Sequence, residues 1–256
     1  MRRPIFQFRQ FNINQAGAAM KVGADGMLLG AWVKPGIPAR ILDIGTGNGL
    51  LALMLAQKST ALIDAIEIDE RAFLQAKENF ENSPWKNRIT AIHASLQGFT
   101  ETCEEKYGLI ISNPPYFEKP NDNKGNNPIK MVKPRSVARS TDTLPLEELA
   151  KCSAQLLAPD GKLFVILPYQ NVEGFIFSAS VYSLHLQEIL TIKSYPHTKI
   201  IRAILCFGFD KPNTVVENEF ITYYALNQYS NQYIELTKDY HNKEFTTRDR
   251  GSNSSF

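Results

Sequence analysis

The chain has 256 residues, of which 43% are hydrophobic and 21% charged, and it carries a formal net charge of +2. These values predict a buried core in one large domain or two small ones, and the charge is too mild to indicate nucleic-acid binding by itself. No stretch approaches the roughly 20 apolar residues that cross a bilayer, so we expect no membrane span. The three cysteines and four histidines show no metal-binding spacing, which predicts a reduced, cytoplasmic protein without a metal site. We also expect no obligate protein partner.

Residues 1–39 precede the first clear strand, and we expect them to form an N-terminal extension that packs on the ligand site. Apolar and polar side chains alternate over residues 6–13, which indicates a short strand or an extended arm. Further along, Gly23 and Gly26 flank Asp25 before an apolar helical run. Two interpretations stay open here: Asp25 is the N-cap of that helix, or the glycines let the backbone approach a ligand.

A glycine-rich loop follows the strand expected at residues 40–44, with glycines at positions 45, 47 and 49. Glycines let the chain turn sharply and bring bare backbone against a ligand. The spacing Gly-x-Gly-x-Gly differs from the Gly-x-Gly-x-x-Gly of dinucleotide-binding loops, and the acidic Asp43 just upstream would repel a pyrophosphate. S-adenosylmethionine has a sulfonium, an ammonium and no phosphate, so this loop favours it as the ligand.

Carboxylates end the next expected strand, over residues 61–69, about 20 residues after the glycine loop. An acid at this place commonly accepts hydrogen bonds from a ribose diol, and we assign this role to Glu67. Asp69 is expected to cap a helix over residues 70–81. Further strands are expected over residues 88–93 and 107–112.

The strand at 107–112 runs into a polar, proline-stiffened segment, Asn113-Pro114-Pro115-Tyr116-Phe117. Two prolines cannot continue a strand ladder and fix their own φ, so the segment is a rigid spur at the carboxyl end of a strand. Pro114 and Pro115 have no N–H, and the spur is therefore rich in acceptors for a substrate amino group. Tyr116 and Phe117 offer flat faces on which a base can stack.

The spur resembles that of the amino-methyltransferases that carry Asn-Pro-Pro-Tyr and methylate a planar amino nitrogen. The likeness becomes closer when residues 15–32, the loop at 41–51, Ser83-Pro84-Trp85 and the spur are taken together. In combination they resemble the bacterial tRNA1(Val) (adenine-37) N6-methyltransferase family over most of residues 5–240. The resemblance implies an α/β, Rossmann-like class I methyltransferase fold, with a seven-stranded mixed sheet flanked by helices and a short N-terminal extension.

The resemblance implies that Asp43, Gly45 and Glu67 contact the cofactor and that Asn113, Pro114 and Tyr116 hold the adenine. From it and from the motifs above we assign the residues of the site. Those expected to bind S-adenosylmethionine are Lys21, Gly23, Asp25, Asp43, Gly45, Gly47, Glu67, Ser95 and Asn113. Ser95 stands where many relatives place an acid after the third strand, and either it or a backbone group serves instead. Those expected to hold the adenine and carry the chemistry are Asn113, Pro114, Pro115 and Tyr116. The partner implied is tRNA, contacted at its anticodon loop.

A polar linker, residues 118–145, follows the spur and is rich in proline and in basic side chains. We interpret it as a phosphate-contacting segment that binds RNA, the alternative being a solvated loop. The residues assigned to substrate binding are Phe117, Lys119, Lys124, Lys130, Lys133, Arg135 and Arg139. Further on we expect a helix over 146–158, strands over 162–167, 186–192 and 200–207, and aromatic core packing over 220–240. The expected methyltransferase domain is 40–245, followed by a flexible tail, 246–256.

Three alternatives to tRNA adenine methylation stay open. The first is methylation of a protein glutamine, which can use the same spur. The second is a DNA adenine methyltransferase, although this chain has no obvious large target-recognition region. The third is an RNA-binding module that keeps the fold without activity. The basic linker argues against the first of these.

Overall fold

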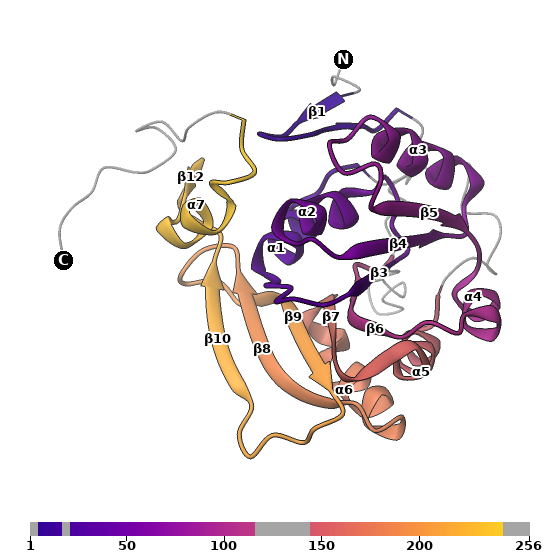
Figure 1. Cartoon of the computed structure of the whole chain (residues 1–256). Coiled ribbons are helices and arrows are strands. Elements are labelled where there is room, and N and C mark those ends of the chain that lie inside the picture. The colour runs from indigo at the N-terminus through magenta and orange to yellow at the C-terminus, as the bar shows by residue number, and fades with distance from the viewer. Residues whose placement is uncertain (1–4, 17–20, 116–143, 243–256) are drawn as a thin grey trace, which may run out of the picture.

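The computed structural model describes residues 5–16, 21–115 and 144–242. Its centre is an eight-stranded mixed sheet between two layers of helices (Figure 1). In spatial order the strands are β10 (Val216–Ile221), β8 (His185–Lys193), β9 (Ile200–Gly208), β7 (Leu157–Pro168), β6 (Tyr107–Ser112), β3 (Arg40–Ile44), β4 (Leu62–Glu67) and β5 (Ile89–His93). Only β9 runs antiparallel to its neighbours β7 and β8, so the carboxyl ends of the other seven lie along one edge.

Helices cover both faces of the sheet, because its central strands are apolar on both sides. Ile41 of β3 packs into the core cluster on one face, and Leu42 and Ile44 pack into the cluster on the other. The first face carries α1 (Ala24–Trp32), α2 (Leu50–Lys58), α3 (Glu70–Glu81) and α7 (Asn231–Thr237). The second carries α4 (Leu96–Thr102), α5 (Leu146–Leu156) and α6 (Val172–Val181), the last preceded by the 3₁₀ turn η1 (Tyr169–Asn171).

Two small hairpins lie outside the main sheet. The alternating segment near the N-terminus forms β1 (Ile5–Gln7) and β2 (Asn12–Asn14), paired antiparallel. Near the C-terminus, β11 (Tyr223–Ala225) pairs with β12 (Gln228–Tyr229). Figure 1 shows this second hairpin and α7 beyond the end of β10, close to α1.

The expected strand count of seven is wrong, since β10 adds an eighth strand beside β8. Four of the six β10 positions, from Val216 to Glu219, are exposed, and this edge strand has no buried alternation that would mark it in the sequence. The expected mixed sheet and the flanking helices are confirmed, and the strands expected over 186–192 and 200–207 are β8 and β9, which pair antiparallel. Asp69 caps α3 as expected, accepting a hydrogen bond from Ala72 N at 2.8 Å.

Candidate active site

The strand order reverses between β3 and β6. From β3 the chain proceeds outward through β4 to β5, then returns to place β6 on the other side of β3. Ile44 and Ser112, the last residues of the two strands, pair in register, and Ser112 Oγ donates to Ile44 O at 2.9 Å. The loop after β3 and the spur after β6 are therefore held together at the place where open α/β sheets bind ligands.

The glycine loop after β3 has left-handed backbone at Gly45, Gly47 and Gly49, with φ of 69°, 60° and 87°. A Cβ added to Gly45 or Gly47 would meet no described atom within 4 Å, whereas one on Gly49 would lie 2.5 Å from the Phe80 ring. Gly49 is thus required by packing against α3. Gly45 and Gly47 turn bare backbone toward open space, as a ligand cradle requires.

Asp43 lies at the base of this loop and is fully buried. Its Oδ2 accepts hydrogen bonds from Thr46 Oγ1 at 2.6 Å and from Ala52 N at 3.1 Å, but Oδ1 is buried and has no partner among the described residues. Burial raises the pKa of Asp43 to about 7, against the opposing effect of the Thr46 and Ala52 hydrogen bonds. An unpaired buried carboxylate oxygen of this kind is suited to bind a cationic ligand, either directly or through a bridging water.

Glu67 ends β4, next to β3, and turns back onto the glycine loop. Its Oε2 accepts a hydrogen bond from Gly47 N at 2.9 Å, and its Oε1 accepts from Ile68 N at 2.9 Å and Asp69 N at 3.0 Å. The carboxylate is half-buried and joins the strand end to the loop. Each carboxylate oxygen accepts more than one hydrogen bond, so hydroxyl groups of a ligand in the cradle can still bind there.

The spur begins at Asn113, which is half-buried, and continues to the buried Pro114 and the exposed Pro115. The Asn113 amide nitrogen lies 3.8 Å from the position that a Cβ on Gly26 would occupy. The same Cβ would lie 2.8 Å from Leu50 Cδ2, so a side chain here would force Leu50 of α2 to shift. The N-terminal helix thereby contributes to the wall of the site.

The start of α1 also carries the other predicted residues of the extension. Gly23 is the N-cap, so Asp25 does not cap the helix. Asp25 instead forms an ion pair with Arg202 of β9, whose Nε lies 3.0 Å from Asp25 Oδ2. Lys21 is exposed and precedes the helix. Arg202 is 177 residues away in the sequence, and no local signal points to this pair.

Ser95 lies after β5, at the same edge of the sheet, but its hydroxyl accepts a hydrogen bond from Gly98 N at 3.1 Å as the N-cap of α4. A capping role therefore already occupies this side chain.

Asn79 of α3 is a further residue that braces the site, and the sequence did not single it out. It is buried, and its Nδ2 donates to Asn48 O at 2.8 Å and to Asn14 O at 2.9 Å. Asn14 N donates back to Asn79 Oδ1 at 2.9 Å. One side chain thus ties the glycine loop and the N-terminal hairpin to α3.

Several predicted residues lie outside the described part of the chain, together with the expected tail. They are Tyr116, Phe117, Lys119, Lys124, Lys130, Lys133, Arg135 and Arg139.

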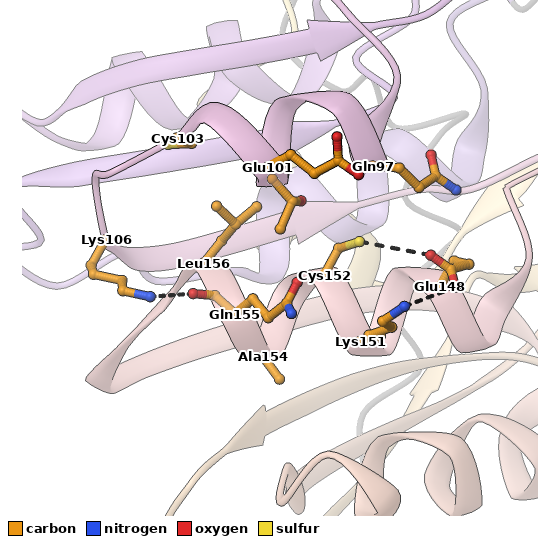
Figure 2. Close-up of a pocket in the computed structure, with 11 residues that line it drawn as sticks. Gln97, Glu101, Cys103, Lys106, Glu148, Lys151, Cys152, Ala154, Gln155 and Leu156 are labelled. Carbon is orange, nitrogen blue, oxygen red and sulfur yellow. Dashed lines mark hydrogen bonds and ion pairs between the residues drawn. The ribbon is translucent and has the colours of Figure 1, made fainter.

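A cavity of about 560 Å³ lies elsewhere, between α4 and α5 (Figure 2). Polar side chains surround it, and Lys151 Nζ lies 3.6 Å from Glu148 Oε1. Burial raises the pKa of the Cys152 thiol, which makes it a weaker nucleophile. None of the predicted site residues lines this cavity.

The described residues contain no cluster of three or more His, Cys, Asp or Glu side chains placed to hold a metal ion. None of the helices in these ranges has both the length and the hydrophobicity to cross a membrane.

A glycine cradle over a buried acid, an acid at the next strand end and an Asn-Pro-Pro spur at the switch point define an S-adenosylmethionine-dependent methyltransferase of the Rossmann-like class. Residues 23–134 match the family described as methyltransferase small domain. A solved structure described as a predicted O-methyltransferase from Agrobacterium tumefaciens superposes with a TM-score of 0.61 at 17% identity, covering 84% of this chain and 96% of that one. The predicted fold class and methyl donor are thereby confirmed.

Curated relatives are far closer in sequence. The tRNA1(Val) (adenine(37)-N6)-methyltransferase of Flavobacterium psychrophilum is 42% identical over 93% of this chain and all of the relative. The protein of the same name from Flavobacterium johnsoniae is 41% identical over the same shares. The chain therefore belongs to the tRNA1(Val) (adenine(37)-N6)-methyltransferase family, as the sequence motifs predicted.

Proposed function

We propose that this protein transfers a methyl group from S-adenosylmethionine to N6 of adenosine 37 in the anticodon loop of a valine tRNA. The observation that carries the proposal is the placing of Asn113 and Pro114 beside the glycine cradle, fixed by the Ser112–Ile44 hydrogen bond. The names of the curated relatives support the choice of substrate and nucleotide.

The residues around the cradle fit the cofactor. Bound S-adenosylmethionine supplies an electrophilic methyl group on a sulfonium. The unpaired Oδ1 of Asp43 suits the positively charged amino-acid end, directly or through water. The backbone of Gly45 and Gly47 leaves space for the ligand, and Glu67 accepts hydrogen bonds from the ribose hydroxyls.

Asn113 and Pro114 act on the acceptor nitrogen. The lone pair of an adenine amino group is delocalised into the ring, which makes it a poor nucleophile. Hydrogen bonds from that amino group to the Asn113 side-chain oxygen and the Pro114 carbonyl favour a more tetrahedral nitrogen and direct its lone pair toward the donor methyl. Attack needs no general base, since the proton leaves to water afterwards, and most of the rate enhancement is positioning.

The target base must leave its stack to reach this site, and an unpaired loop makes that step least costly. We assign base stacking to Tyr116 and phosphate contacts to the basic linker that follows it. We also include in the proposal that the extension at 1–39 packs on the cofactor site and that the protein acts in the cytoplasm. The Asn14–Asn79–Asn48 hydrogen bonds support the first of these, as does the position of Asn113 Nδ2, 3.8 Å from where a Cβ on Gly26 would lie.

The test is a labelled-methyl assay on tRNA from cells that lack the modification, followed by nucleoside mapping. We expect N6-methyladenosine at position 37 of the valine tRNA and no label in protein. Incubation with release factors runs in parallel, because glutamine amides fit the same acceptor-lined spur. If label appears in a glutamine side chain and the tRNA stays unmodified, the protein is a glutamine methyltransferase and this proposal is wrong.

A further inference from the structure

A pile of aromatic rings lies beyond the carboxyl ends of β8 and β10. His197 and Tyr195 come from the loop between β8 and β9, Tyr223 from β11, Tyr229 from β12 and Tyr233 from α7. We call these five rings the aromatic stack. Three separate parts of the chain contribute to it, so the stack is a product of the fold.

Three of the four successive ring pairs in the aromatic stack are stacked, and the pair Tyr195–Tyr223 is tilted. Successive centroids lie 6.2, 5.7, 5.2 and 4.2 Å apart from His197 to Tyr233, with interplanar angles of 20°, 33°, 23° and 10°. The inner end is buried, with Tyr233 only 6% exposed. The outer end opens to solvent at His197, which is exposed, over the half-buried Tyr195. The exposed ring of His197 is therefore the end of the series that a further planar ring can reach from solvent.

The segment that carries the open end has no Asp or Glu from Ile189 to Phe209 and includes Lys193, Lys199 and Arg202. Two of these cations are neutralised by carboxylates of neighbouring elements, which leaves the exposed Lys199 as the cation of this segment without an ion pair among the described residues. Glu219 of β10 lies 2.7 Å from Lys193 Nζ, and Asp25 of α1 lies 3.0 Å from Arg202 Nε. Aromatic faces beside cations are typical of surfaces that bind single-stranded nucleic acid.

The aromatic stack is also connected to the methylation site. Backbone hydrogen bonds from Thr222 N to Lys193 O at 3.0 Å and from Tyr223 N to Ser194 O at 2.9 Å fix it to the end of β8. On its inner side α7 packs against α1, whose Gly26 faces Asn113. The loop after β8, which carries the open end, and the spur after β6 both follow the carboxyl ends of strands that run in the same direction, so they lie at the same edge of the sheet.

We propose that the aromatic stack binds an unpaired base of the tRNA substrate, other than the methylated adenine, on the outer face of His197. The stacked base holds the loop in place while the target enters the site beside Asn113. This inference rests on the proposed tRNA methylation and adds a second, specificity-determining contact to it.

The test compares His197→Ala and Tyr195→Ala with wild type, using hypomodified valine tRNA as substrate. We expect the KM for tRNA to rise about tenfold in each variant, the size of one lost base–aromatic stack. The kcat and the affinity for S-adenosylmethionine should stay within about twofold of wild type, since neither ring lies in the cradle. Tyr195→Phe keeps the ring and should restore the KM.

Phe177→Ala is the matched control, because it removes an aromatic ring that is 72% exposed on α6, on another face of the molecule. His197 is exposed, so its truncation leaves the packing intact. A KM for tRNA in His197→Ala equal to that of Phe177→Ala overturns the inference while the proposed function stands. If wild type methylates no tRNA, the proposed function fails first.

Discussion

Two regions of the molecule look capable of holding a ligand, and they differ in what builds them. The cavity between α4 and α5 is the more obvious hollow, with a volume of about 560 Å³ (Figure 2). It is lined by helix and loop side chains around the Lys151–Glu148 pair. The glycine cradle instead consists of backbone at two strand ends, a buried acid and a proline-stiffened spur.

The comparison teaches that topology locates the chemistry better than cavity size does. In the α4–α5 cavity Lys106 donates to the backbone carbonyl of Gln155, and Lys151 pairs with Glu148. The cradle keeps Asp43 Oδ1 buried without a partner among the described residues, an arrangement that is costly unless a ligand or water compensates it. The following predictions test this contrast.

Replacing Asn113 should have the largest effect. In Asn113→Ala we expect kcat to fall about 10²–10³-fold, as when one preorganised hydrogen-bonding group is removed from an active site. Binding of S-adenosylmethionine, measured by calorimetry, should change little. Asn218→Ala, at an exposed position of β10, is the control and should retain wild-type turnover. Wild-type turnover in Asn113→Ala would remove the spur from the mechanism.

The pH dependence of cofactor binding tests Asp43. Its pKa is about 7 in the folded protein without ligand, and a cationic ligand favours the ionised form. Affinity for S-adenosylmethionine should therefore rise by up to about tenfold per pH unit below 7 and level off above it. Asp43→Asn should bind weakly with no such dependence, and a pH profile identical to wild type would contradict the assignment.

The same pKa predicts a stability effect in the ligand-free protein. The pKa is raised from 3.8 to about 7 on folding, so the folded state binds the proton more tightly than the unfolded state does. The contribution of this group to the free energy of unfolding should be complete below pH 3.8 and be lost as the pH rises to about 7. Urea unfolding of wild type and Asp43→Asn at several pH values measures this contribution. If the free energy of unfolding changes with pH in the same way in both proteins, the raised pKa of Asp43 is contradicted.

Glu67→Gln should weaken the binding of S-adenosylmethionine by about 10- to 100-fold, since a hydrogen bond to a charged group is worth roughly 1.5–3 kcal/mol. The matched control is Glu81→Gln, an exposed position at the end of α3. Equal affinities in the two variants, measured by calorimetry, would exclude Glu67 from ribose binding.

The smallest effect is expected in the α4–α5 cavity. Lys151→Ala removes a partly exposed ion pair of the kind that contributes little to stability. Turnover and cofactor affinity should stay within about twofold of wild type. A loss of cofactor binding in this variant would reverse the comparison between the two regions.

Local chemistry explains which parts could be predicted from the sequence. Gly45, Gly47 and Asn113 follow apolar strands directly, and their roles depend on backbone freedom and on proline stiffness that neighbours in the chain determine. The position of Glu67 beside the glycine loop could be predicted because parallel strand ends meet at one edge. These elements lie where the strand pattern placed them.

The remainder depends on distant partners. Gly49 resembles Gly47 in the sequence, and only the approach of Phe80 separates a packing role from a ligand cradle. The sequence suggests that Asp25 caps a helix, and only the fold brings Arg202 into an ion pair with it. The strand β10 was not predicted, because most of its side chains are exposed at the sheet edge and show no alternation of apolar and polar residues.

The central claim is that the cradle after β3 and the spur after β6 bring the donor methyl and the acceptor amino group together. A crystal structure with S-adenosylhomocysteine and an adenosine-containing RNA tests it most directly. We expect the cofactor sulfur beside Gly45 and Gly47, with Asn113 Oδ1 within hydrogen-bond distance of the adenine N6. A cofactor bound between α4 and α5, or an adenine amino group remote from Asn113, would contradict the account.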